Sequence, residues 1–288
     1  MTVAKTDPEA EKPKTKHANK DLPALLALGR PLVMGILNVT PDSFSDGGLF
    51  LDPATAIAHA ERMVAQGADI LDVGAESTRP YGGATPVLTE QEQARLREVL
   101  PAAVRIGIPV SIDTYKAATA AWALDCGAAI VNDVWGLQRD TRMASLVAAR
   151  RVPVVIMHNR QAADPAIDIV ADVIAFFARS LDIAAQAGIT HDKVVLDPGI
   201  GFGKTPEQSF TCIARLAEFK RFGLPLLVGA SRKRFINTVA PSPPAERLGG
   251  SISAHLCAVE NGAAIVRVHD VAETVQALRV AAALEAAR

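Results

Sequence analysis

Polar side chains of types that bind ligands or transfer protons follow each of eight short apolar runs along the chain. In order they are Asn38, the Glu76-Ser77-Thr78-Arg79 segment, Asp113, Asn132 with Asp133, His158, Asp197, Ser231 with Arg232 and Lys233, and Arg267 with His269. One polar residue after a strand is commonly a helix cap or a turn former. Eight in succession, with these side-chain types, favour an enzyme or a tight binder of small molecules.

The acceptor side chains among them predict one sub-site. Asp113, Asn132 and Asp197 present carboxylate or amide oxygens, and such oxygens suit the amino and ring N–H donors of a flat nitrogen heterocycle. A carboxylate is well matched to an amino-pyrimidine edge, which offers two donors side by side.

The cationic side chains predict a second sub-site for an anion. Arg267 and His269 alternate with an apolar Val268, so both point to the same side of a strand. Asn38 could face them, and Lys233 could bridge the two sub-sites. The sequence therefore predicts a heterocycle bound next to a phosphate-type group.

The segment Asp197-Pro-Gly-Ile-Gly-Phe-Gly-Lys-Thr205 has the look of a nucleotide phosphate loop but departs from it. The position that the phosphate-loop pattern reserves for its first glycine is Pro198, which has no N–H to donate. Thr205, Pro206 and Gln208 read as an N-cap, a first-turn proline and a capping-box partner, which leaves Lys204 in the loop before the helix. Asp197 would repel a phosphate, so this loop is predicted to face a ligand that donates hydrogen bonds.

Eight strand-then-helix units position these side chains. The predicted strands are residues 32–37, 70–73, 109–112, 129–131, 153–157, 193–196, 225–228 and 264–268. The predicted helices are residues 53–66, 89–106, 115–126, 141–151, 165–187, 206–222, 244–261 and 271–287. This alternation predicts the α/β class and a single (β/α)8 TIM barrel over residues 22–288, with a doubly wound open sheet as the runner-up. Residues 1–21 are predicted to be a disordered polar tail.

Bulk composition excludes several classes of partner. A formal net charge of −1 argues against nucleic acid or an anionic membrane as the main partner, and no apolar run is long enough to span a bilayer. Cys126, Cys212 and Cys257 show no paired spacing, so we expect small buried thiols and a reducing cytoplasm.

Several long segments resemble the signature blocks of dihydropteroate synthases, in the same order and over about residues 31–286. The matching blocks are residues 34–48 (MGILNVTPDSFSDGG), 74–80 (GAESTRP), 111–114 (SIDT), 132–133 (ND), 157–158 (MH), 196–204 (LDPGIGFGK), 229–233 (GASRK) and 267–270 (RVHD). The resemblance implies a barrel that joins 6-hydroxymethyl-7,8-dihydropterin diphosphate to 4-aminobenzoate in folate biosynthesis, with release of pyrophosphate. It also implies a homodimer, a Mg²⁺ cofactor and a target of sulfonamides.

The resemblance also implies roles for individual residues. Those expected to hold the pterin are Asp113, Asn132, Asp197, Lys233, Met157 and Gly229. Those expected at the diphosphate are Asn38, which also contacts Mg²⁺, with Arg267, His269 and Thr78. Those expected around the aminobenzoate are Phe44, Asp46, Thr78, Arg79, Pro80, Phe202 and Ser231. The catalytic set is Asp113, Asp197, Lys233, Arg267 and His269.

Three alternatives remain open from the sequence. They are a non-catalytic pterin-binding paralogue, a corrinoid-linked methyltransferase of the same superfamily, and an aldolase that uses Lys233 as a Schiff base. The chain departs from the family pattern at the longer loop from Tyr81 to Val87, at Arg234, and at His158-Asn159-Arg160. The first two departures leave the pterin residues intact but bear on sulfonamide response.

Overall fold

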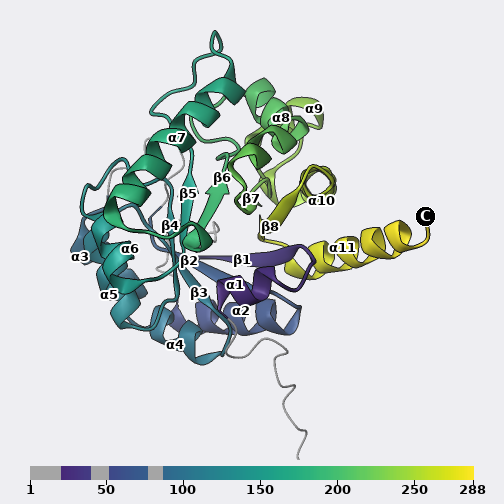
Figure 1. Cartoon of the computed structure of the whole chain (residues 1–288). Helices are drawn as coiled ribbons and strands as arrows, with labels where there is room; N and C mark the ends of the chain where they lie inside the picture. Colours follow the sequence, from purple (N-terminus) through teal and green to yellow (C-terminus); the bar gives the residue numbers. More distant parts are fainter. Residues whose placement is uncertain (1–20, 40–51, 77–86) are drawn as a thin grey trace, which may run out of the picture.

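Eight parallel strands form a closed barrel in sequence order, as predicted (Figure 1). The structure is a computed structural model that describes residues 21–39, 52–76 and 87–288. The strands are β1 Leu32–Asn38, β2 Ile70–Gly74, β3 Val110–Asp113, β4 Ile130–Asp133, β5 Val154–Met157, β6 Val194–Asp197, β7 Leu226–Val228 and β8 Ala263–Val268. The pairing of β1 with β8 closes the barrel and excludes the open-sheet alternative.

Strand alternation separates the barrel interior from its outer wall. On β4, Val131 packs in the large apolar cluster under the helices, whereas Ile130 packs in a second cluster inside the barrel. The interior cluster fills the N-terminal part of the barrel. Polar residues two positions further along the strands, such as Asn132, therefore face inward at the C-terminal end.

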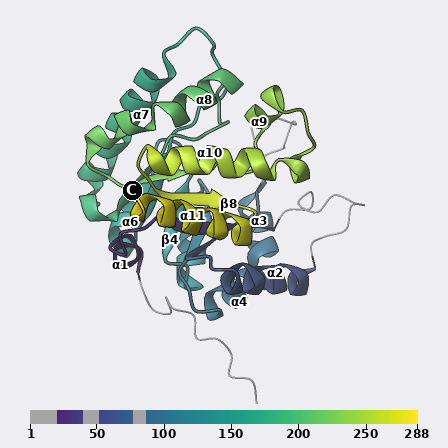
Figure 2. The ribbon, with the colours of Figure 1, turned by 90° about the vertical axis from the view of Figure 1, so that its right-hand side faces the viewer.

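The outer helices largely follow the predicted ranges. They are α2 Pro53–Ala65, α3 Thr89–Leu96, α4 Val99–Arg105, α5 Ala117–Asp125, α6 Met143–Arg150, α7 Ile169–Ala187, α8 Pro206–Ala214, α10 Leu248–Glu260 and α11 Val271–Ala286. The 3-10 helices η1 His191–Lys193, η2 Leu216–Phe222 and η3 Pro244–Glu246 complete the connections. Figure 2 shows α10 and α11 lying side by side along the barrel wall.

The predicted helix over residues 89–106 is wrong as one element, since it is divided into α3 and α4. Pro101 lies in the first turn of α4, where its missing N–H and its ring are tolerated. Inside a continuous helix the same proline would leave the carbonyl of Arg97 without its partner. The chain therefore starts a new helix there.

Two short helices were not predicted. Leu22 and Leu25 of α1 (Leu22–Leu26) are buried and belong to the interior cluster, so α1 closes the N-terminal end of the barrel. Asp21, assigned to the tail, accepts a hydrogen bond from the Ala24 N–H and caps α1. The second is α9 (Arg234–Val239), which follows β7. Residues 1–20 of the predicted tail lie outside the described residues.

Within the described ranges, no helix is both long enough and apolar enough to cross a membrane. Cys126, Cys212 and Cys257 are all free thiols; Cys212 is buried as predicted, whereas Cys126 and Cys257 are only partly buried. Phe176 and Phe177 of α7 are buried in the barrel wall, while Val280 on α11 is 55% exposed.

Candidate active site

The predicted carboxylates and amide meet at the C-terminal end of the barrel. Asp113 is the register partner of Asn132, and Met157 is the register partner of Asp197. All four are buried. They face inward because each is two residues beyond an interior position of its strand, as Met157 is beyond Val155 and Asp197 is beyond Val195.

Arg267 ties two carboxylates together inside the barrel. Its Nε donates to Oδ2 of Asp72 at 2.5 Å, and its Nη2 donates to Oδ2 of Asp113 at 2.7 Å. Burial alone would lower the pKa of Arg267, but Asp72 and Asp113 raise it above its usual range. The guanidinium therefore remains charged and compensates the two buried carboxylates.

Burial raises the pKa of Asp113 to about 7, opposed by Arg267 and reinforced by the nearby Asp72. Burial also raises the pKa of Asp197, opposed by Lys233 and by the Gly199 N–H. Two buried carboxyl groups with elevated pKa values at one end of a barrel are typical of a ligand-binding or catalytic centre.

Three oxygens of this cluster are buried and have no hydrogen-bond partner within the described part of the chain: Oδ1 of Asp72, Oδ1 of Asp113 and Oδ1 of Asn132. Asn132 donates from Nδ2 to Asp72 Oδ2 at 3.0 Å, and this bond turns its carbonyl oxygen away from Asp72. A buried acceptor without a donor costs free energy, about 1–3 kcal/mol. The site is therefore built to receive a ligand that supplies several donors.

The loop after β6 completes this side of the site. Asp197 Oδ1 accepts the Gly199 N–H at 2.7 Å, which fixes the orientation of the carboxylate. Lys233 donates from Nζ to the carbonyl of Ile200, and its ammonium lies 4.6 Å from the ring centroid of Phe202. Phe202 and Lys233, predicted to serve different ligands, are thus direct neighbours.

The loops after β7 and β8 are joined by their polar side chains. Ser231 Oγ accepts the backbone N–H of His269 at 3.2 Å and lies 2.9 Å from its Nδ1. The Ser231 hydroxyl can donate to Nδ1, and in that tautomer a neutral ring carries its proton on Nε2. The next residues pair as well, since Arg232 donates from Nε to Asp270 Oδ2 at 3.0 Å and from Nη2 to Oδ1.

The remaining predicted residues are placed as follows. Asn38 ends β1 opposite Gly74, and Gly229 follows β7 beside Arg267, where an added Cβ would lie 3.6 Å from the Arg267 Cβ. The predicted residues Phe44, Asp46, Thr78, Arg79 and Pro80 lie outside the described residues, as does most of the lengthened loop that starts at Tyr81.

Sequence reasoning assigned no role to Asp72, which the structure joins to Arg267 and Asn132. The available signal was a carboxylate inside the apolar run Ile70-Leu71-Asp72-Val73, where a charge requires a partner. It also left Lys204 without a role, although this lysine is among the largest fully buried side chains.

No cluster of three or more His, Cys, Asp or Glu side chains suited to a metal occurs among residues 21–39, 52–76 and 87–288. Mg²⁺ in phosphate-transferring sites commonly takes one or two protein oxygens and fills its other positions with water and phosphate oxygens. Asn38 offers one amide oxygen at the predicted anion sub-site. The donor set therefore fits a metal carried mainly by a diphosphate.

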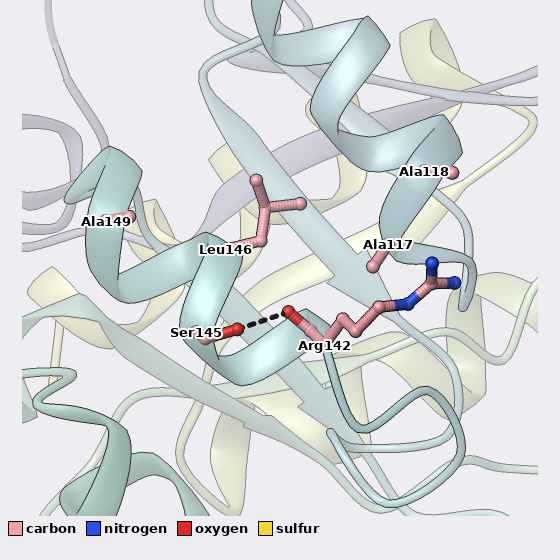
Figure 3. Close-up of a pocket in the computed structure, with 6 residues that line it drawn as sticks. All are labelled: Ala117, Ala118, Arg142, Ser145, Leu146 and Ala149. Carbon is pink, nitrogen blue, oxygen red and sulfur yellow. Dashed lines mark hydrogen bonds between the residues drawn. The ribbon is translucent and has the colours of Figure 1, made fainter.

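A hollow on the outer wall lies between the first turn of α5 and the side of α6 (Figure 3). Its walls are Ala117, Ala118, Arg142, Ser145, Leu146 and Ala149. Ser145 Oγ donates to the Arg142 carbonyl at 2.9 Å, and the Arg142 guanidinium is paired with Asp140. None of the predicted site residues lines this hollow.

Comparison with known proteins gives concordant results. The family model described as "Pterin binding enzyme" matches residues 34–269. The dihydropteroate synthase of Bacillus subtilis (strain 168) is 44% identical over 243 residues, which cover 84% of each chain. A solved dihydropteroate synthase of Xanthomonas albilineans with 4-aminobenzoic acid superposes with a TM-score of 0.85 at 44% identity, covering 90% of this chain and 94% of that one. The Yersinia pestis enzyme in a sulfonamide drug complex has a TM-score of 0.84 at 40% identity, covering 90% and 96%.

Proposed function

Because the chain belongs to the dihydropteroate synthases of the pterin-binding enzyme family, we propose that this barrel end joins a dihydropterin diphosphate to 4-aminobenzoate. The chain is a transferase that makes dihydropteroate in folate biosynthesis. The paralogue, methyltransferase and aldolase alternatives are set aside, since the relatives are synthases over most of their length. The residue roles below are the proposal.

The unpaired buried acceptors carry the pterin assignment. A 2-amino-4-oxo pterin presents its 2-amino group and ring N–H as adjacent donors, and Asp113, Asn132 and Asp197 supply buried oxygens for such donors. Lys233 is the only cation among these pterin residues, and it is assigned to a pterin acceptor. Met157 is assigned as an apolar contact of the pterin ring. Gly229, which has no side chain, leaves room beside the ring.

The proposed reaction begins with cleavage of the bond between the pterin methylene carbon and the diphosphate oxygen. The bonding electron pair leaves with the diphosphate, and the resulting cation is delocalised into the pterin ring. Asp113 and Asp197 stabilise that charge through the ring N–H groups. The lone pair of the neutral aryl amine then forms the carbon–nitrogen bond, and the nitrogen gives up one proton to solvent or to pyrophosphate.

The diphosphate is assigned to Asn38, His269 and the outer side of Arg267, with Thr78 from the loop outside the described residues. When bound, Mg²⁺ would neutralise the developing charge on the leaving group, and Asn38 is the residue assigned to it. His269 is assigned to donate from Nε2, with Nδ1 accepting the Ser231 hydroxyl. Arg267 serves both sub-sites, because its Nη2 is already bound to Asp113.

The aminobenzoate is assigned to the side of the site where Phe202, Lys233 and Ser231 meet, together with Phe44, Asp46, Thr78, Arg79 and Pro80. The X. albilineans relative is solved with 4-aminobenzoic acid and the Y. pestis relative with a sulfonamide drug. We propose that this chain binds both ligand classes at the same place. We also infer that the chain forms a homodimer and that it works in a reducing cytoplasm. Light scattering of the purified chain tests the dimer.

Titration calorimetry with 6-hydroxymethylpterin, which carries no diphosphate, tests the pterin assignment separately from catalysis. The wild type should bind without Mg²⁺, and Asn132→Leu should weaken binding by at least about tenfold, because it removes one acceptor and one support of Asp72. Asn261→Ala, at the opposite end of the barrel, is the matched control. Equal affinity in Asn132→Leu and wild type would contradict the assignment.

A further inference from the structure

Lys204 is a buried cation that the proposed reaction does not use. Its exposed fraction is 1%, and its Nζ lies 2.6 Å from His158 Nδ1, 3.0 Å from the Gly199 carbonyl and 3.2 Å from the Phe202 carbonyl. An ammonium carries three donors, and these contacts supply three acceptors. The backbone of the loop after β6 is therefore folded around this one nitrogen.

Two glycines of the same loop have backbone angles and close contacts that a larger residue would not allow. Gly199 and Gly203 have φ values of +66° and +53°, where a side chain would be strained. A Cβ on Gly199 would lie 2.0 Å from the carbonyl oxygen of His158, and one on Gly203 would lie 2.5 Å from that of Arg160. The loop is thus pressed against the segment 158–160 that follows β5.

A chain of hydrogen bonds runs from Lys204 to the outer helix α7. The lysine ammonium can only donate, so His158 Nδ1 must accept, and the ring N–H is then on Nε2. Nε2 donates to Asp172 Oδ2 at 3.0 Å, and Arg160 donates to Asp172 Oδ1 at 2.9 Å. Burial and the neighbouring Lys204 lower the pKa of His158 to about 4, so the ring is neutral and this arrangement holds near neutral pH.

The loop held in this way makes three contacts with the active site. Gly199 donates its N–H to Asp197 Oδ1, Ile200 offers its carbonyl to Lys233, and the Phe202 ring lies 4.6 Å from the Lys233 ammonium. We propose that Lys204, oriented by His158 and Asp172, is a positioning residue that aligns Asp197, Lys233 and Phe202 for both substrates. The inference rests on the proposed function of these three residues.

Lys204→Met tests the inference, because methionine keeps the length and removes all donors. The dissociation constant of 6-hydroxymethylpterin should rise at least tenfold, and KM for 4-aminobenzoate should rise several-fold through Phe202. Lys204→Arg should recover part of both losses. Lys220→Met, an exposed lysine in η2, should match wild type. A folded Lys204→Met protein whose pterin affinity and KM values lie within twofold of wild type would overturn the proposal.

A second pair of variants decides the matter if Lys204→Met does not fold. Asp172 is partly exposed, so Asp172→Asn and Asp172→Leu should both be tolerated. Asparagine keeps an acceptor for His158 Nε2–H and should stay within twofold of wild type in pterin affinity. Leucine removes that acceptor, so the His158 ring loses the partner that orients it, and pterin binding should weaken at least fivefold. Equal affinities of these two variants would overturn the proposal.

Measurements on the wild type distinguish failure of the proposed function from failure of the role proposed for Lys204. If it neither binds the pterin nor forms dihydropteroate, the proposed function has failed, whatever the variants do. If the wild type is active and the variants retain its pterin affinity, only the role of Lys204 has failed.

Discussion

Arg267 on β8 donates from Nη2 to Oδ2 of Asp113 on β3 at 2.7 Å, across the interior of the barrel. The residue assigned to the diphosphate therefore contacts the residue assigned to the pterin. In the proposed reaction, the leaving group and the ring that acquires positive charge therefore share one guanidinium. A change at either residue is expected to affect both binding of the pterin and loss of the diphosphate.

Asp113→Asn should lower kcat/KM for the pterin diphosphate by roughly 100-fold. The variant keeps the shape of the side chain but loses the charge that binds Arg267 and that is assigned to the pterin donors, and a hydrogen bond to a charged group is worth about 1.5–3 kcal/mol. Steady-state kinetics at saturating 4-aminobenzoate measures the change. Asp125→Asn, a carboxylate of the outer surface, is the control. A loss no larger than that of the control would remove Asp113 from the mechanism.

Asp72→Asn should cost stability as well as activity. Asp72 is fully buried and joins Arg267 to Asn132, and removal of one partner of a buried ion pair costs about 3–5 kcal/mol. Urea unfolding measures the free energy. Asp125→Asn, which breaks the exposed Arg150–Asp125 pair, should cost less than about 1 kcal/mol. Equal losses in the two variants would show that Asp72 is not a structural centre of the site.

Asp270→Asn should affect the diphosphate and spare the pterin ring. The carboxylate of Asp270 binds Arg232 through both oxygens and joins the loops that carry Ser231 and His269. Loss of about 1 kcal/mol at this partly exposed pair should raise KM for the pterin diphosphate roughly fivefold. The affinity for 6-hydroxymethylpterin should not change. An equal loss for both ligands would refute the separation of the two sub-sites.

The burial of His255 should make the free energy of unfolding depend on pH. Its Nε2 accepts the Ala230 N–H at 3.1 Å, and burial, with the nearby Lys233, lowers its pKa from 6.5 to about 3. A folded pKa below the unfolded value means that the stabilisation is complete above pH 6.5 and is lost as pH falls from 6.5 towards 3. The loss approaches about 1.4 kcal/mol per pH unit for one group.

Comparison of wild type with His255→Gln isolates this histidine. Glutamine keeps an acceptor but does not titrate, and both proteins retain Asp113 and Asp133, whose raised pKa values act in the opposite sense. The deficit of the variant in unfolding free energy should shrink as the pH falls from 7 to 4.5. A deficit that is constant over this range would mean that His255 is not held neutral by the fold.

The sequence predicted the elements whose signals are local. Thr205 and Gln208 form the predicted capping box. The predicted start of α7 at residue 165 is wrong, since Asp168 caps the helix and α7 begins at Ile169. The helices α1 and α9 span only 5 and 6 residues, too few for an apolar period to show. The barrel itself was predictable because eight strand-and-helix units repeat.

The site was predictable in its residue types but not in its pairings. The strand ends identified Asp113, Asn132 and Asp197, because the C-terminal ends of barrel strands meet at one face. The Asp72–Arg267 pair joins residues 195 positions apart, and no local pattern indicates which buried carboxylate meets which cation. Lys204 resembles a phosphate ligand in the sequence, whereas its ammonium is enclosed by His158 and two carbonyls of its own loop.

The most direct test of the account is pyrophosphate release by the purified chain, given the pterin diphosphate and Mg²⁺, with and without 4-aminobenzoate and alongside Asp197→Asn. We expect dihydropteroate to form only with the amine, and the rate to fall roughly 100-fold or more in the variant, since Asp197 is the residue proposed to stabilise the pterin cation. Undiminished product formation by Asp197→Asn would contradict the central role of this carboxylate. Pterin binding without product in the wild type would contradict the proposed reaction itself.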